Sequence, residues 1–277
     1  MNIKQKISIS IFSIILLLAF AGSGISTIGT LGVFAQNNDS PKIVLRTVLV
    51  ELFVQEGCPS CPTTEFCLED LAWEYGTSKF ILVQEHLWGD GYDTPETNAR
   101  YDWYVGDGKK GTPDVFIDGL TKRLQGLSCD CVEGNYECYK DAIDEELTRP
   151  SLLELSAVKT SHPNPLPQGE REEEKVANII IEGTVKNSSD TPLKDLAVFG
   201  MVGKEGDEPG LYFYIQDILP FQNMPPLLPG ATFNFKFIPE ISLTPESEID
   251  DEKEVLHLVI FVQNTITKEI LQALYIE

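Results

Sequence analysis

Two cysteines spaced three residues apart carry the clearest chemical signal in the chain. Cys58 and Cys61 follow an apolar, β-branched run at residues 47–54 and open a segment with helical spacing. The pattern predicts a strand that leads into a helix N-terminus, with sulfur at the junction. Unpaired N–H groups and the positive end of the helix dipole favour a thiolate there, so the pair is suited to cycle between dithiol and disulfide. Zinc sites also use this spacing.

The elements that must position the pair follow from apolar periodicity. Residues 61–75 predict a helix that Gly76 ends as a C-cap, and residues 79–85 predict a short buried strand. With the first strand they form a β-α-β unit whose outer strands are parallel. Further on, we expect a strand at 114–118, its hairpin partner at 120–127 and a closing helix at 136–148.

The residues around the pair resemble a known family. The sequence VELFVQEGCPSCP at residues 50–62 is similar to the VELFTSxGCxxCP motif of a secreted thioredoxin-like group in the thioredoxin superfamily. In that superfamily a CxxC begins the first long helix after a central strand. The resemblance covers residues 47–148 and implies an α/β thioredoxin-like domain with thiol-disulfide chemistry.

A second match follows the same chain order. Thr112 and Pro113 stand before the strand at 114–118, where the superfamily has a proline with a cis peptide bond opposite the CxxC. The resemblance implies that Pro113 is that proline and that both residues dock substrate, with the Thr112 backbone pairing with an extended segment. The ring would also hinder the two sulfurs from chelating a metal, which favours redox chemistry over zinc.

Three more residues are candidates for supporting roles. Glu51 resembles the buried acid that accepts a proton near the second cysteine in many thioredoxins; the alternative is an outward-facing glutamate on an alternating strand. His86 and Trp88 belong to an aromatic-rich insert, residues 86–108, which resembles the insert of the same group and is a candidate lid. His86 would shuttle protons there or only cap the local backbone. The aromatic residues would face substrate or pack as a small satellite core.

Four further cysteines, Cys67, Cys129, Cys131 and Cys138, complete a set of six. In an exported domain we expect them to be structural bridges. Cys129 and Cys131 are poorly placed to bond to each other, so one is expected to join Cys138 and the other Cys67. The sequence leaves the pairing open, with a second thiol pair and a four-sulfur metal site as alternatives. We predict no metal and no cofactor.

The N-terminus predicts export. Lys4 and Lys6 precede an uncharged run at residues 7–20, and Val33-Phe34-Ala35 before Gln36 is typical of a cleavage site. The stretch is also long enough to remain as a membrane anchor. Residues 1–35 are therefore interpreted as a signal peptide or N-terminal membrane anchor. The rest is expected to be extracytoplasmic, secreted or anchored to the outer face of the cell membrane, with membrane contact only through this segment.

Composition bounds the remaining organisation. The 277 residues are 42% hydrophobic, which allows two domains, and the net charge of −22 argues against nucleic-acid binding. Residues 36–150 are predicted to be the thioredoxin-like domain. Residues 151–277 lack cysteine and predict an all-β immunoglobulin-like sandwich. Its seven strand-like runs are 152–158, 177–185, 196–202, 211–215, 232–238, 255–263 and 269–276.

The functional hypothesis is an exported thiol-disulfide oxidoreductase that acts on cysteine-containing exported proteins. Cys58 would be the attacking thiolate, Cys61 would resolve the mixed disulfide, and a membrane partner would recycle the pair. The direction of electron flow stays open. The alternative is a non-enzymatic extracellular binding or structural protein with a permanent Cys58–Cys61 bridge. A third hypothesis, metal handling such as copper delivery, requires sulfur or histidine ligands open to solvent.

Overall fold

The computed structural model describes residues 44–129, 136–163, 177–206, 212–239 and 256–276, all within the compact unit Pro41–Glu277. The predicted export segment and Cys131 lie outside the described residues. The helices of the described part are α1 (Cys61–Tyr75), α2 (Pro95–Val105) and α3 (Glu137–Leu147). Its strands are β1 (Val48–Val54), β2 (Phe80–His86), β3 (Asp114–Ile117), β4 (Lys122–Gln125), β5 (Leu153–Pro163), β6 (Ala177–Asn187), β7 (Leu196–Lys204), β8 (Tyr214–Asn223), β9 (Thr232–Phe237), β10 (Leu256–Asn264) and β11 (Ile270–Ile276).

The local elements around the cysteine pair match the periodicity of the sequence. Strands β1 and β2 are parallel and joined by α1, while β3 runs antiparallel to β1 and forms a hairpin with β4. Helix α1 ends at Gly76, whose φ of +70° suits glycine and whose amide donates to the Ala72 carbonyl. The predicted β-α-β unit, hairpin and closing helix are therefore present.

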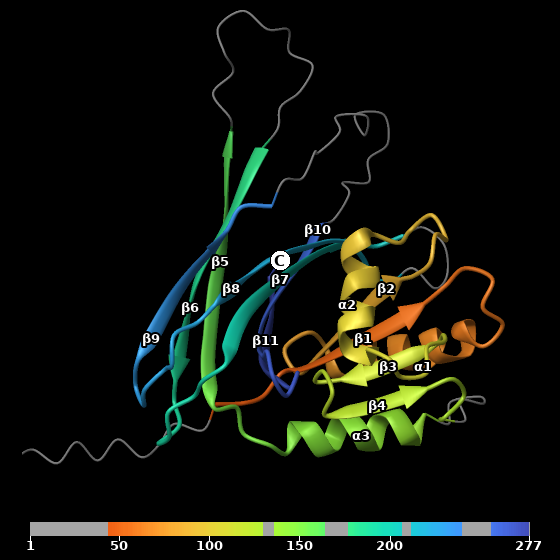
Figure 1. Cartoon of the computed structure of the whole chain (residues 1–277), viewed down its shortest axis with the longest axis horizontal. Helices are drawn as coiled ribbons and strands as arrows, with labels where there is room; N and C mark the ends of the chain where they lie inside the picture. Colours follow the sequence, from red (N-terminus) through yellow and green to blue (C-terminus); the bar gives the residue numbers. More distant parts are fainter. Residues whose placement is uncertain (1–43, 130–135, 164–176, 207–211, 240–255, 277) are drawn as a thin grey trace, which may run out of the picture. The chain divides into compact units, whose positions relative to one another are not determined.

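The expected fold class, an α/β thioredoxin-like domain followed by a separate immunoglobulin-like sandwich, is wrong. Strands outnumber helices among the described residues, and one mixed sheet runs through both halves in the order β11-β10-β7-β8-β2-β1-β3-β4 (Figure 1). The halves join where β2 lies parallel to β8, with Gln84 opposite Tyr214 and the Gln84 amide donating to the Phe213 carbonyl (2.8 Å). Strands β1 and β2 are buried on both faces, and the C-terminal strands cover the face opposite α1 as well as extending the sheet.

Three apolar clusters show how those faces are covered. Helices α1 and α3 pack against one face of β1, β2 and β3. On the opposite face Leu49, Ile81 and Val83 pack against side chains of β7, β8, β10 and β11. The three-stranded sheet β5-β6-β9 packs in turn on the other side of those strands, which gives the C-terminal half a sandwich-like arrangement.

Polar contacts also fasten the start of the described chain to its end. Arg46 Nε donates to Asp118 Oδ2 (2.7 Å), and its guanidinium donates to the Ile270 carbonyl (2.5 Å). Gly119, with φ +70°, lies so close to the β10–β11 turn that a Cβ would be 1.9 Å from the Lys268 carbonyl oxygen. The turn after β3 can therefore approach this second turn only as glycine.

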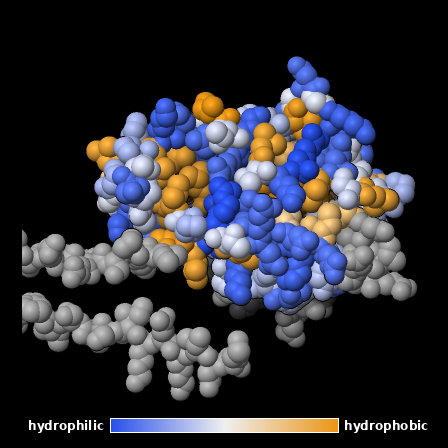
Figure 2. All heavy atoms as spheres, turned by 90° about the horizontal axis from the view of Figure 1, so that it is seen from below, coloured by the Kyte–Doolittle hydropathy of each residue, from blue (hydrophilic) through white to orange (hydrophobic). Residues whose placement is uncertain are grey.

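Helix α2 was not predicted. It begins at a capping box in which the Thr94 side chain accepts from the Thr97 amide (3.1 Å) and the Thr94 amide donates to Thr97 Oγ1 (3.0 Å). Among the described residues no helix is long and apolar enough to cross a bilayer. Figure 2 shows a face on which hydrophilic residues predominate and hydrophobic residues lie in separate groups.

Candidate functional site

The two cysteines at the start of α1 form a disulfide. The Cys58–Cys61 sulfurs are bonded, and the Cα atoms are 5.5 Å apart. Cys58 is half-buried, whereas Cys61 is 2% exposed and packs with Val54 in the cluster under α1. An incoming thiolate can therefore reach Cys58 more easily than Cys61.

The first turn of α1 surrounds this disulfide with positive potential. The helix begins at Cys61 with Pro62 in its first turn and carries no acidic residue there. Ser60 occupies the N-cap position, and its side chain caps no amide of the described helix; its Oγ lies 3.7 Å from Cys58 Sγ. The unpaired amides and the helix dipole therefore favour negative charge on a sulfur released here.

Thr112 and Pro113 lie at the same end of the sheet as the disulfide. The peptide bond between them is cis, as the resemblance predicted, and Pro113 is buried while Thr112 is half-buried. Because Phe53 pairs with Asp114, Pro113 falls beside the last residue of β1, from which the loop to Cys58 departs. The Pro113 carbonyl accepts the Gly126 amide (2.7 Å).

His86, the last residue of β2, is linked to the loop that carries the disulfide. It pairs with Val54 across the parallel strands, and its Nδ1 lies 2.7 Å from Asp90 Oδ2. The same Asp90 oxygen accepts the amide of Glu56 (3.0 Å), two residues before Cys58. His86 is therefore more than a cap of its own backbone, and Asp90, which the sequence analysis did not single out, connects the two segments.

The aromatic insert packs largely as a satellite core. Tyr101 and Tyr104 of α2 are buried with Phe53 and Phe116. Trp88, which has φ +61°, is 42% exposed, and its ring meets Tyr101 edge-on with centroids 5.6 Å apart. Trp88 is thus an exposed aromatic side chain of the candidate lid.

Glu51 is fully buried, not outward-facing. One of its carboxylate oxygens pairs with Arg100 Nε of α2, and the other accepts the Tyr104 hydroxyl (2.6 Å). Arg100 also donates to the Tyr104 hydroxyl (2.8 Å) and to Gln263 Oε1 of β10 (3.2 Å). The network joins β1, α2 and β10, and both Glu51 oxygens are engaged in it, so the predicted proton-acceptor role of Glu51 gains no support from these contacts.

Glu85 of β2 lies in the same buried network. Its Oε1 is 3.8 Å from Arg100 Nε, and neither of its oxygens accepts a hydrogen bond from a described residue. Burial raises the pKa of Glu85 well above its ordinary value, and repulsion by Glu51 raises it further, while Arg100 opposes both. Two acids with one guanidinium between them thus favour a shared proton. A signal was present in the sequence for Glu51, which interrupts an apolar strand, but Glu85 lies between Gln84 and His86 at the polar end of β2.

Two half-buried acids on α1 lie along the helix from Cys61. Burial raises the pKa of Glu65 to about 7, with repulsion by Glu69 as the second cause. Burial also raises the pKa of Glu69, whose Oε1 accepts from Gln84 Nε2 (3.4 Å). At neutral pH Glu65 is therefore a group that can hold or release a proton one turn beyond Cys61.

The remaining cysteines are bonded where the structure describes them. Cys129 joins Cys138, with Cα atoms 5.5 Å apart, and Cys67 is also disulfide-bonded. Cys131 lies outside the described residues. In the described ranges no group of three or more His, Cys, Asp or Glu side chains is placed to hold a metal ion.

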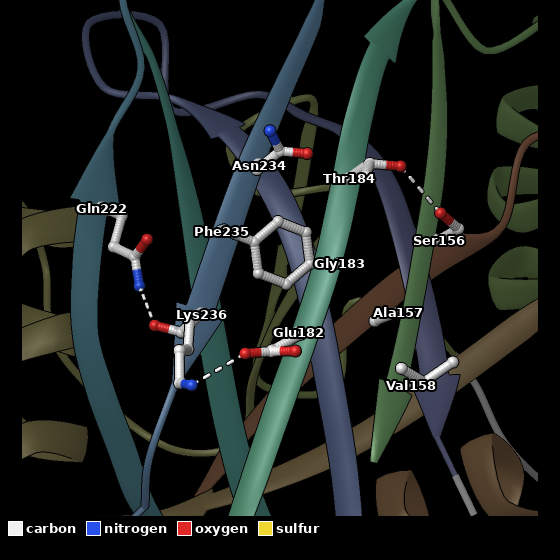
Figure 3. Close-up of a pocket in the computed structure, with 10 residues that line it drawn as sticks. All are labelled: Ser156, Ala157, Val158, Glu182, Gly183, Thr184, Gln222, Asn234, Phe235 and Lys236. Carbon is white, nitrogen blue, oxygen red and sulfur yellow. Dashed lines mark hydrogen bonds and ion pairs between the residues drawn. The ribbon is translucent and has the colours of Figure 1, made fainter. Parts of the chain in front are cut away.

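A cavity in the C-terminal half lies on other elements. About 680 Å³ in volume, it is lined by side chains of β5, β6, β8 and β9 (Figure 3). Its polar groups pair with one another: Lys236 with Glu182 at 2.7 Å, and Ser156 with Thr184 at 2.9 Å. We therefore assign no chemistry to it.

Comparisons with known proteins reach the fold only. No family model matches the chain, and no curated protein matches it. HBP35 of Porphyromonas gingivalis is similar in structure: the TM-score is 0.58 at 18% identity, over 84% of this chain and 75% of that one. The chain therefore shares an overall fold with HBP35.

Other solved structures are less similar. The calcium-binding mutant of Bacteroides uniformis β-glucuronidase 2 has a TM-score of 0.32 at 18% identity, over 43% of this chain and 12% of that one. The Pseudomonas fluorescens alkylpurine DNA glycosylase bound to DNA has a TM-score of 0.26 at 16% identity, over 50% and 33%. These values are too low to bear on function. The disulfides themselves are consistent with an extracytoplasmic location.

Proposed function

We propose that the chain is an exported thiol-disulfide oxidoreductase that acts on cysteine-containing extracytoplasmic proteins through Cys58 and Cys61. The observation that carries the proposal is a disulfide at the N-terminus of α1 with one half-buried and one buried sulfur. Cys58 takes part in the exchange with substrate, and Cys61 is the partner that opens and recloses the bridge. The sequence resemblance of residues 50–62 to the secreted thioredoxin-like group also supports this role.

The surroundings of the disulfide suggest how substrate docks. Thr112 and Pro113 lie at the same end of the sheet as the loop to Cys58. In the proposal they form the wall along which an extended substrate segment lies, and Trp88 borders the site as an exposed aromatic side chain. The protein is secreted or anchored outside the cell membrane, where a membrane redox partner recycles the pair.

A redox titration of the purified protein tests the proposal. It is equilibrated in dithiothreitol or glutathione buffers, and alkylated cysteines are located by mass spectrometry. We expect Cys58 and Cys61 to titrate together at roughly −120 to −270 mV, the range of thiol-disulfide enzymes. The variant with serine at both Cys129 and Cys138 is the matched control and should leave that potential unchanged. If the pair stays oxidised to below about −300 mV, as structural disulfides do, the chain is instead a binding protein with a permanent bridge.

A further inference from the structure

His86 and Asp90 form a buried couple beside the loop that leads into the cysteine pair. His86 is 6% exposed, and the Asp90 side chain is 1% exposed. Asp90 accepts four hydrogen bonds: from His86 and the Glu56 amide at Oδ2, and from the amides of Tyr92 and Asp93 at Oδ1. Such a set suits an ionised carboxylate, which only accepts.

This arrangement fixes the tautomer of His86. Because the Asp90 carboxylate can only accept, His86 Nδ1 must carry the hydrogen, which leaves a lone pair on Nε2 in the neutral ring. Nε2 is buried and has no hydrogen-bond partner among the described residues. A neutral imidazole held at one nitrogen and vacant at the other can take up and release a proton at the vacant nitrogen.

The fold places this ring on the same side of the sheet as the disulfide. Phe80 and Leu82 of β2 face the cluster under α1, and by strand alternation Gln84 and His86 share that face. Val54, which pairs with His86, lies in the same cluster as Cys61. Asp90 holds both the imidazole and the main chain at Glu56, so it fixes the position of the ring relative to the cysteine loop.

We propose that His86 is the proton-transfer group for exchange at Cys58–Cys61 and that Asp90 is its positioning residue. The inference rests on the proposed thiol-disulfide activity and deepens it. The substrate of the proposed step is a dithiol, and the Cys58–Cys61 disulfide is the oxidant.

The step balances without another reactant. A substrate thiol gives its proton to His86 Nε2, and its sulfur attacks Cys58 Sγ; the bond to Cys61 breaks, and the electron pair goes to the Cys61 sulfur. His86 then passes the proton to Cys61, which is buried and poorly placed to take one from water. The second substrate thiol then gives its proton to His86 Nε2, and its sulfur attacks the substrate sulfur of the mixed disulfide. Cys58 leaves as a thiolate and takes that proton from His86. The dithiol is oxidised and the protein disulfide is reduced.

Other titratable groups face this ring and must be separated from it. Asp90 and Tyr92 come from its own loop, and Tyr214 of β8 lies against it with ring centroids 6.3 Å apart. On α1, which covers this face, Glu69 contacts Gln84 and Glu65 lies one turn nearer Cys61. Glu65 is the competing proton carrier, because burial raises its pKa to about 7.

The test follows reduction of the Cys58–Cys61 disulfide in the full chain by dithiothreitol, with rapid alkylation and mass spectrometry, from about pH 5 to about pH 9. We expect H86Q to slow reduction on the order of 100-fold at neutral pH and to flatten the pH profile beyond the ionisation of dithiothreitol itself. D90N should slow it less. The reduction potential should stay unchanged, because a proton relay alters a rate and not an equilibrium.

The matched control is H257Q, which removes another buried histidine, one that contacts Tyr275 in the C-terminal half. Equal rates and pH profiles for H86Q and H257Q would overturn the inference. The inference would also be overturned if E65Q removed the pH dependence of the reduction rate and H86Q did not. A shifted potential in H86Q would show a merely structural role. If dithiothreitol does not reduce the wild-type pair at all, both the proposed function and this inference are wrong. If the pair is reduced at the same rate with and without His86, only this inference is wrong.

Discussion

Replacing Arg100 by methionine tests the buried network that ties α2 to the central sheet. The guanidinium is the cation for both Glu51 and Glu85, and it donates to Tyr104 and Gln263. Methionine retains apolar bulk but leaves two buried carboxyls without a cation. Breaking a buried ion pair in this way costs about 3–5 kcal/mol. The loss of the cation–π contacts with Tyr104 and Phe261, at 4.9 and 5.0 Å, adds about 1 kcal/mol.

We therefore expect R100M to lower the free energy of unfolding by about 4–6 kcal/mol at pH 7, measured by urea denaturation with the disulfides intact. The loss should grow as the pH rises. Arg100 lowers the pKa of Glu85, so its removal raises that pKa further above the unfolded value near 4.3, and the stability that Glu85 contributes is lost as the pH rises.

The control is K110M, which breaks the exposed ion pair between Lys110 and Asp102 of α2 (2.6 Å). It should change stability by less than about 1 kcal/mol. A loss for R100M as small as that for K110M, or one that does not vary with pH, would refute the argument that burial makes this pair indispensable.

Two more predictions follow from single contacts. E85Q should be more stable than the wild type at pH 8 but not at pH 4. The pKa of Glu85 is raised in the folded state, so its stabilising contribution is present below its ordinary pKa and is lost as the pH rises through its folded pKa. Urea titrations at several pH values check this, and stability curves that run parallel for the two proteins would contradict it. G119A should destabilise the chain well beyond the roughly 1 kcal/mol expected for G126A. Both glycines have positive φ, but only at Gly119 would an added Cβ lie 1.9 Å from a backbone oxygen, that of Lys268. Equal thermal midpoints for the two variants would contradict this prediction.

The sequence predicted local elements better than their assembly. The α1 helix was predicted correctly because its periodicity, its proline near the start and Gly76 at its end agree. Helix α2 was missed, although Thr97, Arg100, Tyr101 and Tyr104 are the buried residues at helical spacing and Thr94 with Thr97 forms a capping box. The concentration of aromatics there suggested a loop, which hid that signal.

The fusion of the halves into one sheet could not be read from local patterns. It depends on the pairing of Gln84 with Tyr214, residues far apart in sequence, and strand pairing leaves little local trace. A hint was available, because β1 and β2 are apolar on both faces, and a sheet buried on both sides needs a second cover. The seven strand-like runs predicted a separate sandwich, but the C-terminal strands are the cover of Leu49 and Val83.

Asp90 and Glu85 were missed for different reasons. Asp90 acts through a loop that folds back onto Glu56, and a short polar turn gives no sign of its partner. Glu85 stands between Gln84 and His86 at the end of β2, where a polar residue is typical of a strand end and does not indicate burial. The pairing of Arg100 with Glu51 spans 49 positions, so no local pattern in the sequence indicates it.

The hydrogen bond between Arg46 and the last strand has a consequence for the order in which the molecule can fold. The guanidinium reaches the carbonyl of Ile270, 224 positions later, and the Thr47 amide reaches Gln272, 225 positions later. A ribosome completes the early helices and strands long before their final neighbours exist, and pairing over such separations is slow. Until then Leu49, Ile81 and Val83 remain uncovered. A nascent chain halted midway would therefore expose an apolar sheet face, the kind of surface that chaperones and proteases recognise.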